Sequence, residues 1–136
     1  MKVMLDLNVL LDVLQRREPH YTDSAAVLSL ALGGHIEACL PGHAITTIHS
    51  LVGKTLDKSQ ADQAIDWLLR HFDIAGADKP VLIRARGYAM ADFEDAVVAS
   101  LAVNAACSSI VTRNVRDFQH SPVPALSPAE LLVSLG

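Results

Sequence analysis

Several features are scarce in this 136-residue sequence, and each scarcity excludes a class of protein. Cysteine occurs only as Cys39 and Cys107, both among apolar or small neighbours, so we expect two buried free thiols in a reducing cytoplasm and no disulfide. No apolar stretch reaches the roughly 18 residues that suggest a membrane span. Asp6 interrupts the apolar start of the chain too early for a signal peptide. These absences favour a cytoplasmic protein with no membrane partner.

Basic residues are also too few to outnumber the acidic ones. Lys and Arg total 11, Asp and Glu total 15, and the net charge is -4. This balance argues against a general nucleic-acid binder held by a basic surface, but it does not exclude a nuclease whose acids are offset locally by metal. Because 51% of the residues are hydrophobic and only 19% are charged, we expect a folded globule. No repeat, linker or low-complexity tract divides the chain, so one domain is expected over residues 1–136.

Hydrophobic periodicity predicts alternating short strands and helices. Strands are expected at residues 3–5, 36–40, 109–112 and 125–126, and helices at residues 9–14, 21–32, 46–56, 59–71, 79–89, 93–104 and from 128 onward. Ser59 and Asp62 have the spacing of a capping box, and so do Ser127 and Glu130. The alternation predicts an α/β fold with a mostly parallel central sheet and helices on both of its faces.

Three acidic fragments follow apolar elements or begin a helix. They are Asp6-Leu7-Asn8, Asp92-Phe93-Glu94-Asp95 and Asn114-Val115-Arg116-Asp117. Ligand sites in an open α/β sheet lie outside the carboxyl ends of the strands, so we expect these fragments to meet there. Mg²⁺ prefers oxygen ligands and is usually bound through one or two carboxylates together with substrate phosphates. The fragments therefore predict metal-assisted phosphodiester chemistry.

The order of these fragments resembles the PIN domain, and within it the VapC-type toxin ribonucleases. The resemblance rests on Asp6-x-Asn8, Asp92-x-x-Asp95-Ala96, Thr112-x-Asn114-x-x-Asp117-Phe118 and the close of the chain from Pro122 to Glu130. It implies an endoribonuclease that depends on Mg²⁺ or Mn²⁺ and is held inactive by a small antitoxin protein. By position, it implies that Asp6, Asp95 and Asp117 form the catalytic site and that Thr112 and Asn114 shape it. The same three carboxylates, with Asp92, are the implied metal ligands.

One departure from the family pattern concerns a further acid. The family usually supplies a Glu early in the helix after the second strand, and that place falls here on Ser50, or on His49 if the register slips by one. Serine carries no charge, and histidine is a softer ligand than Mg²⁺ prefers. Asp92 is expected to compensate. The alternative is a catalytically weakened PIN-like module that binds RNA or protein.

Several of these residues also have a purely structural interpretation. Asp92 and Asp95 have the spacing of an acidic capping pair, which a helix N-terminus favours without any metal. Arg113 and Arg116 flank the acidic fragment, where they can bind phosphate or neutralise Asp117. The sequence leaves both alternatives open.

A phosphotransfer domain of the haloacid-dehalogenase or response-regulator type is a rival, because it also places an Asp after the first strand. Against it, Asn8 stands where a second acid is needed, and no lysine follows a late strand in the required way.

An apolar surplus in the helices expected at residues 46–56 and 59–71 suggests self-association. Six residues exceed what one helix face buries and predict a homodimer, namely Leu51, Val52, Leu56, Ile65, Leu68 and Leu69.

Overall fold

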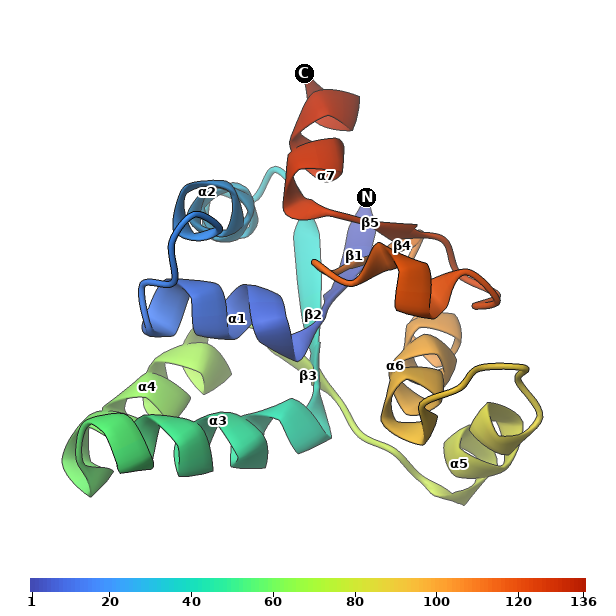
Figure 1. Ribbon diagram of the computed structural model, residues 1–136, viewed down its shortest axis with the longest axis horizontal. Coiled ribbons are helices and arrows are strands. Elements are labelled where there is room, and N and C mark those ends of the chain that lie inside the picture. The colour runs from blue at the N-terminus through green and yellow to red at the C-terminus, as the bar shows by residue number, and fades with distance from the viewer.

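Five short parallel strands form one sheet in the order β3-β2-β1-β4-β5 in the computed structural model, which describes residues 1–136 (Figure 1). The strands are β1 (Lys2–Leu5), β2 (Glu37–Pro41), β3 (Asp73–Ala75), β4 (Ser109–Val111) and β5 (Ala125–Leu126). In the register, Met4 of β1 is paired with Cys39 on one side and with Ile110 on the other. The parallel sheet is confirmed. β3 was not predicted, because its three residues lie at the edge of the sheet and include no fully buried side chain.

Six helices and one short 3-10 helix connect the strands, and a seventh helix follows the last strand. They are α1 (Leu7–Leu14), α2 (Tyr21–Leu32), α3 (Gly42–Thr55), α4 (Lys58–His71), α5 (Lys79–Arg86), α6 (Phe93–Asn104), η1 (Val115–Phe118) and α7 (Pro128–Leu135). Helix α3 begins at Gly42 directly after β2, four residues earlier than predicted. None of the helices combines the length and the apolar character that crossing a bilayer requires.

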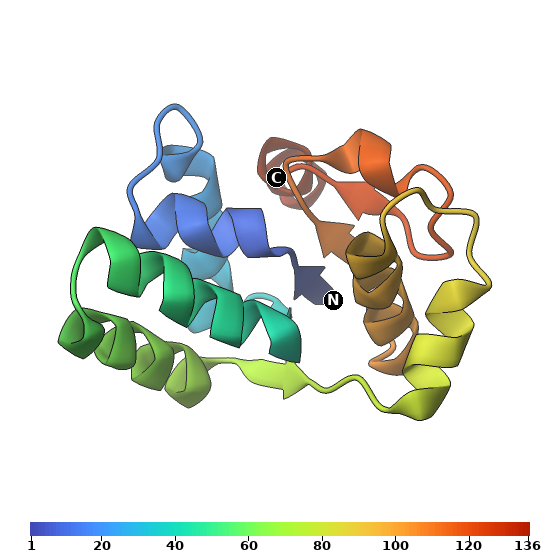
Figure 2. The same cartoon turned by 60° about the horizontal axis from the view of Figure 1, so that its bottom comes forward.

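The two faces of the sheet bury two separate hydrophobic cores. Successive residues of a strand point to opposite faces, so Val3 and Leu5 pack with α1 to α4 and α7, whereas Met4 packs with α5 and α6. Figures 1 and 2 show these two groups of helices on either side of the strands. This arrangement confirms the prediction of helices on both faces. Cys39 and Cys107 are buried free thiols in the second core, as predicted.

The predicted capping boxes had different outcomes. At α7, Ser127 Oγ accepts from the backbone N–H of Glu130 and the Glu130 carboxylate accepts from the backbone N–H of Ser127, which confirms that box. At α4 the prediction of Ser59 with Asp62 was wrong. Asp57 caps this helix by accepting from the backbone N–H of Gln60 at 2.7 Å.

The apolar surplus in α3 and α4 is mostly used within the fold. Val52 and Leu68 are buried in the first core, and Leu51 and Ile65 pack against it. Of the six residues from which self-association was predicted, only Leu56 and Leu69 remain largely exposed, at 55% and 53%. The sequence argument for a homodimer is correspondingly weaker.

The strand order reverses at β1, and this reversal indicates where on the sheet a ligand site is expected. The chain proceeds from β1 through β2 to β3 on one side, then returns to β4 and β5 on the other side of β1. Ligands of open α/β sheets bind in the crevice at such a reversal, outside the carboxyl ends of the strands. Here the crevice lies beyond the ends of β1 and β4.

Candidate functional site

Asp6 and Thr112 lie side by side at the reversal of strand order. Asp6 follows β1 and Thr112 follows β4, and the backbone N–H of Asp6 donates to the Val111 carbonyl at 2.9 Å. The Thr112 hydroxyl donates to Asp6 Oδ2 at 2.8 Å, and both side chains are buried. Asp6 is also the N-cap of α1, since its Oδ1 accepts from the backbone N–H of Leu7 at 2.8 Å. The structural and functional interpretations of Asp6 are therefore compatible.

Asn8 ties the two strand ends together. Its Nδ2 lies 3.2 Å from Asp6 Oδ2 and 3.3 Å from Thr112 Oγ1, and its Oδ1 accepts from the backbone N–H of Arg113 at 3.2 Å. Thr112 Oγ1 also accepts from the backbone N–H of Asn114 at 3.0 Å. These bonds hold the Asp6 carboxylate in one orientation and bring Thr112 and Asn114 to the place where the sequence predicted them.

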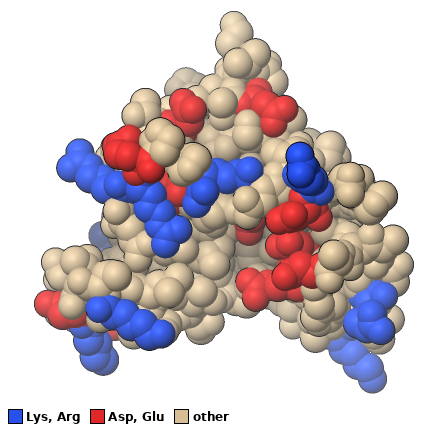
Figure 3. Space-filling model, viewed as in Figure 1, with Lys and Arg blue, Asp and Glu red and all other residues tan.

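The first turn of α6 brings further carboxylates to the same crevice. Asp92 is the N-cap of this helix, because its Oδ1 accepts from the backbone N–H of Asp95 at 3.0 Å. Glu94 and Asp95 line a hollow of about 220 Å³ together with Asp6, Asn8 and Asn114. Figure 3 shows acidic side chains gathered in the central hollow of this face. Asp92 thus has the capping role that the sequence left open and still belongs to the acidic cluster.

The pKa of Asp95 is raised by its surroundings in this crevice. Partial burial, followed by like-charge repulsion from Asp92, Asp6, Asp117 and Glu94, raises it from 3.8 to about 7. We call these five residues the acidic cluster. Asp117 is exposed on η1 and does not line the hollow, but it lies close enough to act on Asp95. The four predicted metal ligands therefore lie in one region of the molecule, near enough for their charges to act on Asp95.

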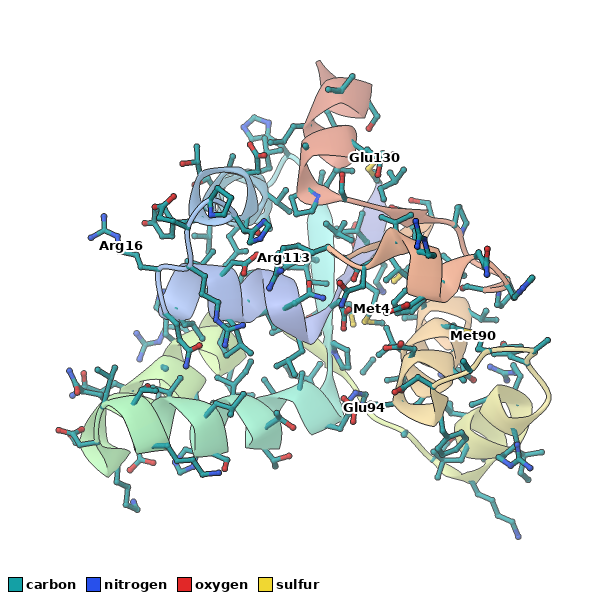
Figure 4. All side chains as sticks on the ribbon, viewed as in Figure 1. Met4, Arg16, Met90, Glu94, Arg113 and Glu130 are labelled. Atoms are coloured by element: carbon teal, nitrogen blue, oxygen red, sulfur yellow. The ribbon has the colours of Figure 1, made fainter.

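Burial also raises the pKa of Asp6, although the Thr112 hydrogen bond and the Leu7 N–H oppose the rise. Two residues that the sequence analysis did not select act on it as well, because Glu94 raises this pKa and His43 lowers it. His43 lies in the first turn of α3, with its Nε2 3.8 Å from Glu94 Oε1. Figure 4 shows Glu94 where the first turns of α3 and α6 approach each other. The sequence analysis expected this helix to begin at residue 46. Its actual start at Gly42 puts His43 directly after β2 and beside the site.

The position proposed for the missing family acid does not reach this site. His49 Nε2 lies 2.7 Å from Asp62 Oδ1 of α4, and Lys58 Nζ lies 2.9 Å from Asp62 Oδ2. Ser50 is exposed and does not line the hollow. The side chain of α3 that approaches the acidic cluster is His43, so the assignment of the gap to Ser50 or His49 is corrected.

The position of Arg113 decides against one of the two uses that the sequence left open for it, the neutralisation of Asp117. Its Nε lies 2.9 Å from Oδ2 of Asp12 in α1, and no salt bridge joins it to Asp117. Asp12 is completely buried and also accepts from the Ser24 hydroxyl at 2.9 Å. The sequence analysis did not anticipate this pair, because Asp12 and Arg113 are brought together only by the packing of β4 beside β1.

The acidic cluster has the chemistry of a divalent-cation site. No three His, Cys, Asp or Glu side chains converge closely enough to hold an ion as they stand. Mg²⁺, however, usually takes only one or two carboxylates from a protein and keeps several waters. A cation would also relieve the repulsion that raises the pKa of Asp95. The donor set therefore fits a hard divalent ion.

Comparisons with known proteins agree with this geometry. A model of the PIN domain family matches residues 2–116. Among solved structures, the fold is similar to a toxin-antitoxin complex from Klebsiella pneumoniae, with 17% identity, 93% of this chain and 97% of that chain covered, and a TM-score of 0.70. It is similar to VapBC-1 from nontypeable Haemophilus influenzae, with 16% identity, coverage of 95% and 99%, and a TM-score of 0.71.

A third similar structure is the Mycobacterium tuberculosis toxin VapC20, described as cleaving the sarcin-ricin loop, with 8% identity, coverage of 79% and 86%, and a TM-score of 0.64. No curated protein matches the sequence. The family model covers most of the chain and includes Asp6, Asp95 and Thr112. The protein belongs to the PIN domain family.

Proposed function

We propose that this protein is a divalent-metal-dependent endoribonuclease and the toxin of a toxin-antitoxin pair, acting in the cytoplasm. The observation that carries the proposal is the acidic cluster at the carboxyl ends of β1 and β4, where repulsion and burial raise the pKa of Asp95 to about 7. Strongly perturbed carboxylates in a crevice are candidates for functional groups. Structural capping alone accounts for Asp92 but not for the convergence of Asp6, Asp95 and Asp117.

Asp6 and Asp95 are the principal metal ligands in this proposal, with Asp92 and Asp117 completing the set. Mg²⁺ or Mn²⁺ held there would supply a lowered pKa for the attacking water and a positive charge beside the phosphate. Thr112 and Asn8 fix the Asp6 carboxylate by hydrogen bonds, so it is oriented before any ligand arrives. Asn114 lines the hollow and contributes a polar side chain for the substrate.

An RNA-cleavage assay tests this proposal. Purified protein should cut single-stranded RNA when Mn²⁺ or Mg²⁺ is present and should stop when EDTA is added. Asp95→Asn should lose the activity. Asp66→Asn should retain it, because Asp66 is an exposed residue of α4 that does not line the hollow. Metal-independent cleavage, or cleavage that survives Asp95→Asn, would reject the proposal.

The alternative is a catalytically weakened PIN-like module that binds RNA or protein. It is favoured by one observation, which is that α3 presents His43 to the acidic cluster and no carboxylate. A protein that binds Mn²⁺ and RNA but cuts no RNA would support this alternative. The phosphotransfer rival has less support, because no lysine lines the hollow around Asp6.

An antitoxin and a second copy of the chain are the proposed protein partners. The similar structure from Klebsiella pneumoniae is a toxin-antitoxin complex, which motivates the first. An Arg or Lys side chain of an antitoxin would neutralise the acidic cluster in place of metal. Leu56 and Leu69, the two largely exposed apolar residues at the ends of α3 and α4, motivate the second.

A further inference from the structure

A second pocket adjoins the acidic cluster on the same edge of the sheet. It encloses about 410 Å³ and is lined by α2, by the start of α7 and by Arg113 of the loop after β4. Arg113 stands between Thr112 and Asn114 in the chain, so one short loop borders both the acidic cluster and this pocket. The volume lies in the range of small-ligand sites. The loop of residues 112–114 therefore connects the two sites.

Arg113 presents an unused hydrogen-bonding edge to this pocket. Its Nε lies 2.9 Å from Oδ2 of the buried Asp12 in an ion pair that anchors the guanidinium, although the Nε–H makes no hydrogen bond of good geometry. No hydrogen bond within the protein involves its two Nη groups, and its side chain is one-quarter exposed. In Figure 4 the Arg113 side chain extends from its loop toward α1 and α2. An anchored guanidinium with free N–H groups is suited to planar ligands that accept two hydrogen bonds.

The charges in the pocket decide against a phosphate group. Asp23 and Arg113 both line the pocket, and the buried Asp12 already balances the charge of Arg113. A phosphodiester would meet the carboxylate of Asp23, and the guanidinium of Arg113 is already paired with Asp12. A purine base avoids this conflict, because it carries both hydrogen-bond acceptors and hydrogen-bond donors on its edges and has no charge.

We infer that this pocket binds a guanine base of the RNA strand, next to the phosphodiester at the acidic cluster. Arg113 donates to the O6 and N7 acceptors of guanine, which is the commonest specific contact of arginine with a base. Asp23 accepts from the N1 and N2 hydrogens on the other edge, and Pro19 and Pro128 supply apolar surface for the ring faces. This inference rests on the proposed ribonuclease function and assigns it a base preference.

The experiment is a titration of metal-free protein with guanosine monophosphate, followed by NMR in EDTA. Cytidine monophosphate, ribose 5-phosphate and inorganic phosphate are the comparison probes. Guanosine monophosphate should bind at least ~10-fold more tightly than each of them, and Arg113→Lys and Asp23→Asn should each remove that preference. Arg113→Lys keeps a positive charge beside Asp12, and Asp23 is exposed, so both variants are designed to fold.

Arg116→Lys and Asp66→Asn are the matched controls, because neither residue lines the pocket. Equal binding of all four probes, no saturable binding, or an unchanged preference in Asp23→Asn would overturn the inference. If Arg113→Lys does not fold, Asp23→Asn alone decides. The titration contains no metal and reads no cleavage. Guanine-selective binding by a protein that cuts no RNA would therefore reject the nuclease proposal alone, and cleavage without guanine-selective binding would reject the pocket alone.

Discussion

The Thr112 hydroxyl donates to Asp6 Oδ2 at 2.8 Å and joins two residues that are 106 positions apart in the chain. Both side chains are buried at the ends of adjacent parallel strands. The bond stabilises the carboxylate and opposes the rise that burial causes in the pKa of Asp6. It is the most direct link in this structure between the strand order and the acidic cluster.

Replacing Thr112 by valine should therefore raise the pKa of Asp6 further and weaken the proposed activity. The variant keeps the shape of the side chain but leaves Asp6 Oδ2 with one donor fewer, so the free energy of unfolding should fall by about 1–3 kcal/mol. Thermal unfolding and RNA cleavage are the measurements. Thr112→Ser is the control, since it retains the hydroxyl. Equal stability and activity of the valine variant would show that the bond contributes nothing.

Asp6→Asn and Asp95→Asn should each abolish most RNA cleavage while the fold is retained. An amide has nearly the shape of a carboxylate but lacks the charge that binds metal. Without metal, the melting temperature of Asp95→Asn should stay level or rise, because repulsion within the acidic cluster is relieved. Cleavage at wild-type rates by either purified variant would remove these residues from the site.

The titration of Asp95 should make the metal-free protein less stable as the pH rises from about 4 to about 7. Its pKa is about 7 in the folded protein against 3.8 ordinarily. The folded state therefore binds more protons than the unfolded state in this window, and the contribution of Asp95 to stability decreases as the pH rises through it. Denaturant unfolding in EDTA at several pH values measures the slope. The same slope in Asp95→Asn would contradict the assignment to this carboxylate.

A carboxylate in place of His43 should strengthen metal binding. His43 is the α3 residue that approaches Glu94, so His43→Glu adds an oxygen ligand of the kind that Mg²⁺ prefers. Mg²⁺ binding measured by calorimetry should tighten several-fold, and cleavage supported by Mg²⁺ should rise relative to cleavage supported by Mn²⁺. Ser50→Glu, on an exposed part of the same helix, is the matched control and should leave metal binding unchanged. Tighter Mg²⁺ binding by Ser50→Glu with unchanged binding by His43→Glu would return the position of the missing family acid to Ser50.

Sedimentation should give a dimer, and an antitoxin should compete with Mn²⁺ for the acidic cluster. Leu69→Lys places a charge at one of the two exposed apolar residues from which the dimer is proposed, and it should shift the protein toward the monomer. Antitoxin affinity should fall in Asp6→Asn, because a basic side chain loses its partner. A wild-type monomer at micromolar concentration would contradict the first expectation. Antitoxin binding that is indifferent to both Mn²⁺ and Asp6→Asn would contradict the second.

The sequence by itself determined the elements whose signals are local. Helix α6 spans the predicted residues 93–104, and α7 begins with the predicted box of Ser127 and Glu130. In both cases the cap and the apolar period lie within a few residues of each other, so neighbours in the chain encode the structure. The same holds for the acid after β1, and the three fragments in their order identified the PIN domain family.

Only the tertiary structure decided which of these residues meet. The return of the chain to β4 on the far side of β1 places Thr112 against Asp6 and Arg113 against the buried Asp12. The contacts of α3 with its neighbours turn His49 toward α4 and leave His43 beside Glu94. Each of these contacts joins different elements of the fold, and the elements' own signals do not specify their neighbours. Strand order and helix packing, which local periodicity does not encode, therefore determine the composition of the site.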